Sequence, residues 1–433
     1  MLLRDVTLPD GQRVDIRIED GTIDAIGRRL QGEPMIDARG LRVTPGAIDV
    51  HVHFREPGDP HKETWATGTR AAAAGGVTVV VDQPNTEPPT VTRSAVRDKI
   101  ELAENAAIVD FGINGGVTQD WDPDGVLDEP IAALGEVFMA DSTGDMGVEA
   151  GLVAEAIEAA GESEVLVTVH AEDEQYFDTT VQSRSDAAAW SDYRRPLAEV
   201  TAATRACELA EGGHTRLHIA HASTPGAIDR AVSAGATCEV CPHHLLLSTE
   251  DLDRLGTYGR MNPPLRDEAT RKAVYERVRQ GAVTMIATDH APHTLDEKET
   301  DIWSAPSGVP GVETMLPLLL NEAMEGRLGY DDVARLTATA PATRYRFDRK
   351  GRIAPGYDAD LVLFDPTQHQ EISAKQLHTD CGWTPFEGHT GIFPQAVLLR
   401  GSVAYKDPES DIPIPEPTGD GPFGPICGEN VVQ

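Results

Sequence analysis

Residues 43–58, VTPGAIDVHVHFREPG, carry the strongest local signal in this sequence. The first half of the segment is apolar, as a buried β-strand is, and His51 and His53 follow where that strand is expected to end. Side chains two residues apart on a strand point to the same face, so the two imidazoles can converge on one metal ion. A His-x-His pair is weak evidence by itself, because most such pairs are structural or exposed, and its context decides its meaning.

Around this segment, from about residue 44 to residue 346, short apolar runs alternate with helical stretches rich in Ala and Glu. Repeated alternation of strand and helix predicts a parallel sheet, and the length of the region favours a closed (β/α)8 barrel of the TIM type over residues 47–346. An open doubly wound sheet is the alternative. Three of the alternating pairs are TVVVD (78–82) with TRSAVRDKIELAENA (92–106), EVLVTVHAED (164–173) with LAEVTAATRACELAEG (197–212), and RLHIAHAS (216–223) with GAIDRAVSAG (226–235).

Further polar residues stand at the ends of later apolar runs. His170 lies in VTVHAED, His221 in HIAHAS and Asp289 in MIATDHAPH. In a barrel the carboxyl ends of all strands open onto one mouth, so residues far apart in sequence meet there. Four histidines and one carboxylate at this mouth predict a site for one or two divalent metal ions.

The two ends of the chain have a different pattern of residues. Residues 2–43 form short alternating runs separated by turn signals such as Asp10-Gly11, and residues 351–365 and 395–405 are again β-like. We therefore expect a small antiparallel sheet in which both ends pair. The predicted division is a β-sandwich domain of residues 1–46 and 347–433, and the barrel between them.

Composition excludes several classes of function. The chain has 433 residues and a net charge of −34, from 71 acidic and 37 basic residues, and such a surface repels nucleic acid and anionic membranes. No apolar run approaches the ~20 residues that a membrane span needs. The acidity also suggests a salt-rich cytoplasm, where screening weakens self-repulsion.

The N-terminal residues lack the features of a signal peptide, and five scattered cysteines give no disulfide framework, so a cytoplasmic protein with reduced thiols is expected. Cys238 and Cys241, followed by His243 and His244, imitate half of a zinc ribbon. No second Cys-x-x-Cys pair completes it, so we interpret this segment as a packed strand end.

Several separate segments resemble the dihydroorotases of the amidohydrolase superfamily. The resemblance implies a metal-dependent barrel hydrolase with a β-sandwich built from both termini. It extends over nearly the whole chain, in HVHFREPG (51–58), KETWATGTRAAAAGGVT (62–78), QPNTEP (83–88), CPHHL (241–245), NPPLR (262–266), ATDHAPH (287–293), SGVPGVETMLPL (307–318) and TPFEG (384–388).

Carried over residue by residue, the resemblance makes His51 and His53 ligands of one zinc ion, and His170 and His221 ligands of a second. Asp289 would bind metal and act as general base and acid. A water held between two cations loses a proton near neutral pH and attacks the amide carbonyl, and Asp289 would then pass the proton to the departing ring nitrogen.

One position departs from the family pattern. The segment GEVFMADSTG (135–144) resembles a stretch in which a lysine, carboxylated by carbon dioxide, bridges the two metals, and here Glu136 is the aligned residue. Glu136 supplies a carboxylate directly, and Asp141 in the same segment is the competing candidate. If neither residue binds metal, a site with a single ion could still support hydrolysis.

The substrate implied by the resemblance, dihydroorotate, carries a carboxylate beside its ring. Arg55 can form a bidentate pair with that group. The resemblance places Asn85, Asn262 and His293 around the ring as well. From the residues alone, Asn85 and Asn262 fit turns equally well, because both stand beside prolines.

The implied reaction is the reversible hydrolysis of (S)-dihydroorotate to N-carbamoyl-L-aspartate, the third step of pyrimidine (UMP) biosynthesis. The expected partner is a small-molecule substrate, and a homo-oligomer is the assembly considered. Allantoinase and hydantoinase, which open related cyclic amides, are the nearest alternatives, but allantoinase-like sequences carry Asn at the position of Arg55. A non-catalytic scaffold is a second alternative, although such relatives usually lose metal ligands.

Overall fold

The computed structural model describes residues 1–140, 146–415, 417, 419 and 421–432. Its centre is a ring of parallel strands in two hydrogen-bonded groups, β6–β8 and β9–β13. Parallel bridges join the groups at both seams, Val52 to His290 and Gly115 to Leu134. The barrel is therefore closed, and the open-sheet alternative is wrong. The strands are β6 (Ala47–Val52), β7 (Val77–Asp82), β8 (Asp110–Ile113), β9 (Leu134–Phe138), β10 (Leu166–His170), β11 (Arg216–Ile219), β12 (Thr237–Val240) and β13 (Met285–Ile286).

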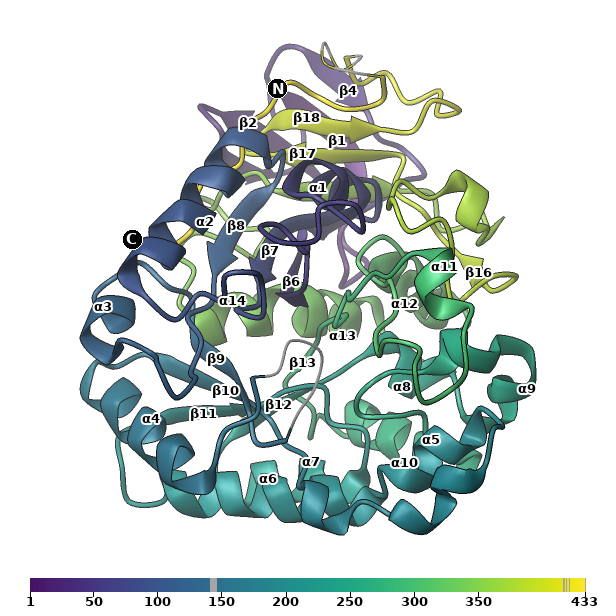
Figure 1. Cartoon of the computed structure of the whole chain (residues 1–433). Coiled ribbons are helices and arrows are strands. Elements are labelled where there is room, and N and C mark those ends of the chain that lie inside the picture. The colour runs from purple at the N-terminus through teal and green to yellow at the C-terminus, as the bar shows by residue number, and fades with distance from the viewer. Residues whose placement is uncertain (141–145, 416, 418, 420, 433) are drawn as a thin grey trace.

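Helices surround this ring, as Figure 1 shows for α4, α6, α7 and α10. Strand β7, with the sequence VTVVVD, is buried along its whole length, as expected for a parallel strand covered on both faces. Thr92 and Thr224 cap the first turns of α2 and α7 through their side chains, which explains where these helices begin. The helices are α1 (Trp65–Ala74), α2 (Arg93–Ala106), α3 (Pro123–Leu127), α4 (Ala150–Glu162), α5 (Ala188–Tyr193), α6 (Pro196–Ala210), α7 (Pro225–Ser233), α8 (Pro242–Leu246), α9 (Leu252–Leu255), α10 (Glu268–Arg279), α11 (Leu295–Lys298), α12 (Met315–Met324), α13 (Tyr330–Ala334) and α14 (Ala340–Tyr345).

Strands from both ends of the chain share one sheet, in the order β18-β17-β14-β5-β1-β2-β3 with β4 beside β1. Figure 1 shows these strands gathered at one end of the molecule. The sheet is mixed rather than antiparallel, because β4 and β5 both pair with β1 in parallel. The strands are β1 (Leu2–Thr7), β2 (Arg13–Glu19), β3 (Thr22–Gly27), β4 (Met35–Asp37), β5 (Arg42–Pro45), β14 (Leu361–Phe364), β17 (Ala396–Leu399) and β18 (Ser402–Lys406), and a separate hairpin pairs β15 (Gln370–Glu371) with β16 (Thr390–Gly391).

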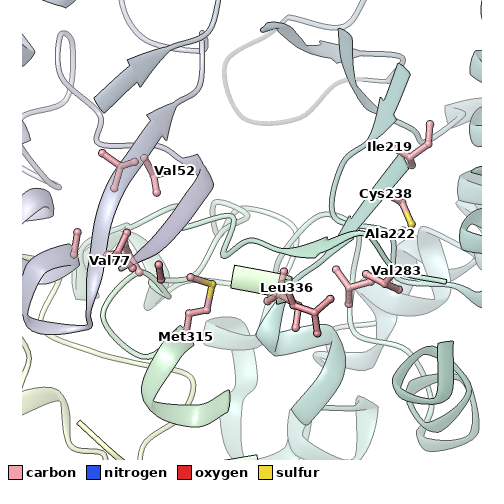
Figure 2. Packing of buried hydrophobic residues seen from close by; sticks show 14 of the residues in the cluster. Val52, Val77, Ile219, Ala222, Cys238, Val283, Met315 and Leu336 are labelled. Atoms are coloured by element: carbon pink, nitrogen blue, oxygen red, sulfur yellow. The ribbon is translucent and has the colours of Figure 1, made fainter. Parts of the chain in front are cut away.

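Alternate side chains of this sheet enter two different cores. Leu361 and Leu363 join an apolar cluster enclosed by the terminal strands, whereas Val362 and Phe364 belong to the larger cluster of the barrel. Figure 2 shows side chains of that larger cluster from β6, β11 and β12 and from the helical layer, including Met315 and Leu336. Because side chains alternate between the two faces of β14, this strand packs the terminal sheet against the barrel. The exact domain boundaries remain a prediction.

The last described residues return to the barrel. The backbone of Phe111 in β8 hydrogen-bonds to Glu429 at 3.0 Å and to Val431 at 2.9 Å. Within the described residues, no helix combines the length and the apolar character that crossing a membrane requires.

The net charge of −34 leads to a prediction about salt. The screening (Debye) length falls from about 10 Å at 0.1 M salt to about 3 Å at 1 M, so the repulsion between like charges on the folded chain weakens over that range. We expect the melting temperature to rise by several degrees between these concentrations of sodium or potassium chloride, measured by circular dichroism. A melting temperature that stays constant or falls would contradict the hypothesis of a salt-rich cytoplasm.

Candidate metal and active site

Six polar residues from five strands meet at the carboxyl-terminal mouth of the barrel. His51 and Glu136 lie within β6 and β9, and His170 is the last residue of β10. The other three lie in the segments that leave strands. These are His53, His221 and Asp289, and all six residues are buried. The structure therefore brings together the whole set of residues that the sequence predicted as metal ligands.

Glu136 is at the centre of the group. Its Oε1 lies 2.5 Å from His221 Nε2 and 3.1 Å from His170 Nδ1, and its Oε2 lies 3.2 Å from His51 Nε2. Asp141, the competing candidate, lies outside the described residues. Glu136 follows Gly135, whose φ is +126° and where an added Cβ would lie 2.2 Å from the Thr168 carbonyl oxygen. Only glycine fits there, so the local backbone is built to deliver Glu136 to the mouth.

Asp289 lies on the other side of the group. Its Oδ1 is 3.0 Å from His53 Nε2 and 3.5 Å from His51 Nε2. Asp289, His221 and Arg55 all have a left-handed backbone, with φ of 49°, 33° and 60°. Such φ values are uncommon outside glycine and concentrate where a chain holds functional side chains.

The electrostatics at two of these histidines, His51 and His170, favour positive charge. Burial lowers the pKa of His51, but Glu136, Glu239 and Asp289 outweigh burial and hold that pKa well above its usual value. Burial is likewise overcome at His170, where hydrogen bonds from its ring to the carboxylates of Glu136 and Glu172 raise the pKa to about 9. A field that attracts protons to these rings also attracts a cation to the point where their nitrogens meet Glu136.

The donor atoms fit divalent metal. His51, His53 and Glu136 form one group whose ligand atoms all lie within 4.8 Å of one another, and Glu136, His170 and His221 form a second. Imidazole nitrogens and carboxylate oxygens are the ligands that zinc takes in hydrolases. Glu136 belongs to both groups, so the arrangement can hold two ions that share one carboxylate.

A narrow cavity opens over these residues. Arg55, Asn85 and Asn262 line it together with His53, His170, His221, Glu136 and Asp289. The Asn85 side chain also contacts His53 Nδ1 at 2.6 Å, and Asn262 accepts a hydrogen bond from the indole of Trp190. Three of the four predicted substrate-binding residues thus face the same space as the candidate metal ligands.

His293, the fourth, lies behind Arg55 and does not line this cavity. It is fully buried, and its Nε2 is 3.0 Å from the Ser307 carbonyl oxygen and 3.3 Å from an Arg55 nitrogen. Burial lowers the pKa of His293 to about 3, so the ring is neutral. Its position allows it to support Arg55 and the wall formed by Ser307.

Sequence reasoning missed two buried carboxylates that hold the histidines. Glu239 in β12 accepts from His51 Nδ1 at 2.5 Å and from His218 Nε2 at 3.1 Å, and Glu172 contacts His170 Nε2 at 3.1 Å. Neighbouring imidazoles overcome burial and keep the pKa of Glu239 well below its usual value. The only signal in the sequence was a glutamate inside the apolar run TCEVC. His218 in β11 is also buried, against Glu239.

Comparison with known proteins agrees with this geometry. The model of the amidohydrolase family matches residues 42–387. A protein named dihydroorotase from Halobacterium salinarum is 56% identical over 93% of this chain and 96% of its own, and one from Methanosarcina acetivorans is 42% identical over 91% and 88%. The solved structure of L-hydantoinase (dihydropyrimidinase) from Arthrobacter aurescens superposes with a TM-score of 0.90, at 27% identity over 95% of this chain and 97% of that one. The chain belongs to the amidohydrolase family, whose members are metal-dependent hydrolases.

Proposed function

We propose that this protein is a dihydroorotase, which hydrolyses the ring amide of (S)-dihydroorotate to N-carbamoyl-L-aspartate and catalyses the reverse cyclisation in pyrimidine biosynthesis. The observation that carries the proposal is the position of Arg55, a buried guanidinium on the wall of the cavity that three of the site histidines and Asp289 also line. Guanidinium pairs with carboxylate in bidentate geometry, and dihydroorotate carries that group beside the amide to be cleaved. The similarity to proteins named dihydroorotase supports the same substrate.

We propose zinc as the metal, with two ions per chain. His51 and His53 would hold one, His170 and His221 the other, with Glu136 shared and Asp289 completing the first. When bound, such ions lower the pKa of water to near 7 and polarise the amide carbonyl.

The protein's own groups then position the substrate and move the proton. Arg55 binds the substrate carboxylate, and the amides of Asn85 and Asn262 lie where they can hold the ring. The pKa of Asp289 is lowered, because His51 and His53 outweigh burial, so its carboxylate is ionised and ready to accept a proton. It takes the proton that water loses on attacking the carbonyl carbon and delivers it to the ring nitrogen as the C–N bond breaks.

Substrate choice tests the assignment. Purified, metal-analysed protein should turn over L-dihydroorotate and leave allantoin and hydantoin nearly untouched. Arg55→Lys keeps the charge but loses the bidentate pair, and because a charged hydrogen bond is worth about 1.5–3 kcal/mol, we expect KM to rise at least about tenfold.

A neutral cyclic amide provides the control for Arg55, since it has no carboxylate for the arginine to bind. Equal loss of activity toward dihydroorotate and toward a slow neutral substrate would show that Arg55→Lys acts on the fold. Preferred turnover of hydantoin would support the second candidate, a hydantoinase, which the likeness to the Arthrobacter aurescens structure favours.

Glu239 is expected to position His51. Replacing it with Gln removes the charge that fixes the ring, and loss of such a partner typically costs 10- to 100-fold in metal affinity or activity. Zinc affinity, measured by competition with a chelator, should fall by about that factor. Glu199 is a buried carboxylate that bonds Ser223, Thr224 and Arg266, and Glu199→Gln should leave zinc affinity unchanged. Equal affinity in both variants would remove the role given to Glu239.

We also propose that the protein works in the cytoplasm. Its five cysteines are all free, as a reducing compartment would keep them.

A further inference from the structure

Three ligand-type side chains lie together just after β12, outside the site described above. Cys241 precedes α8, and His243 and His244 lie in its first turn. All three are buried, and one ligand atom from each lies within 4.8 Å of the others. None of them lines the cavity that contains Glu136 and Asp289.

The tautomer of His244 is fixed by the backbone. Its Nε2 lies 2.9 Å from the carbonyl oxygen of Pro263, and a carbonyl can only accept, so Nε2 carries the hydrogen. Burial holds the pKa of His244 well below its usual value, so the ring is neutral and Nδ1 has a free lone pair. This Nδ1 is buried and has no hydrogen-bond partner among the described residues. A histidine whose second nitrogen donates to a carbonyl is the usual form of a metal ligand.

His243 also carries a ring nitrogen without a hydrogen-bond partner among the described residues. This nitrogen, Nε2, is buried, and the two imidazole rings lie 4.2 Å apart between centroids. Buried polar atoms are rarely left unpaired in folded proteins, and two on adjacent residues beside a thiol indicate a shared ligand. Cys238, the other half of the Cys-x-x-Cys pair, is not a member of the cluster.

We propose that Cys241, His243 and His244 bind a single zinc ion, separate from the catalytic metals. Sulfur with two imidazole nitrogens is a donor set typical of zinc, with a fourth position left for another ligand. Binding releases the thiol proton of Cys241 to solvent, and the thiolate formed pairs with the cation. Because His244 also holds the Pro263 carbonyl, the ion stiffens the segment that carries Asn262 into the substrate cavity. Cys241 therefore acts with the two following histidines and not with Cys238.

Cobalt(II) spectroscopy tests this site independently of catalysis. Metal-free protein is reconstituted with cobalt, and thiolate coordination is detected as a near-ultraviolet charge-transfer band. None of the proposed catalytic ligands contains sulfur, so the band reports only on a cysteine. We expect the band in the native chain, complete loss of it in Cys241→Ser, and its full retention in Cys238→Ser, which changes a buried cysteine in the preceding strand β12.

Two further variants keep the result decisive. Cys427 is exposed, so Cys427→Ser excludes adventitious binding at the surface and should retain the band. His244→Ala should weaken or shift the band even where Cys241 is intact. Absence of the band in cobalt-loaded native protein, or its persistence in Cys241→Ser, would overturn the proposal. Turnover of dihydroorotate is assayed separately, so failure of this site and failure of the proposed function are distinguishable.

Discussion

Replacing Asp289 with Asn is expected to lower kcat/KM for dihydroorotate by about 10³-fold or more. General acid–base catalysis contributes roughly 10²- to 10⁴-fold, and Asp289 would serve both in accepting the proton and in returning it to the leaving nitrogen. An amide has nearly the same shape but cannot hold that proton. The loss should appear in kcat, measured by the disappearance of dihydroorotate under steady-state conditions.

Metal analysis separates the two roles given to Asp289. A variant that keeps its metal but loses turnover would assign the effect to proton transfer, whereas loss of metal would assign it to ligation. Asp360 is a buried aspartate that binds Lys350 far from the mouth, so Asp360→Asn controls for stability and should keep kcat. If Asp289→Asn keeps kcat/KM within tenfold of the native chain, Asp289 is not the general base.

The sequence alone predicted the positions that regular geometry fixes. His51 and His53 are two apart at a strand end, and His170 and Asp289 occupy equivalent places on later strands. A closed barrel with parallel strands brings such places to one mouth whatever lies between them. The prediction succeeded there because it needed only the period of a strand and the rule for barrel ends.

It failed where the deciding contact joins distant strands. Glu239 approaches His51 because only β13 separates β12 from β6 in the closed barrel, and no local pattern links residues that are 188 positions apart in the sequence. The parallel pairing of β4 and β5 with β1 was missed for the same reason, since turn signals specify only neighbouring hairpins. His293 was expected in the substrate cavity, and its position behind Arg55 depends on how the segment around Ser307 packs.

Glu136 belongs to both groups of candidate metal ligands, so replacing it is the second substitution expected to have a large effect on activity. Glu136→Gln is expected to lose more activity than the roughly 100-fold that an outer partner of a metal ligand costs, because three imidazoles contact this one side chain. The neutral amide removes the charge that attracts the cations and turns an NH2 group toward a ring nitrogen. Zinc content should fall below that of the native chain. Glu136→Asp keeps the charge with a shorter reach and should be intermediate.

Carbon dioxide distinguishes Glu136 from the carboxylated lysine of the family pattern. A lysine carbamate forms only with carbon dioxide, whereas the carboxylate of Glu136 is part of the side chain. Metal-free protein reconstituted with zinc in buffer purged of carbon dioxide should therefore recover full activity, and added bicarbonate should give no further gain. Dependence on bicarbonate would show that another residue supplies the bridge, and unchanged zinc content in Glu136→Gln would show that Glu136 binds neither ion.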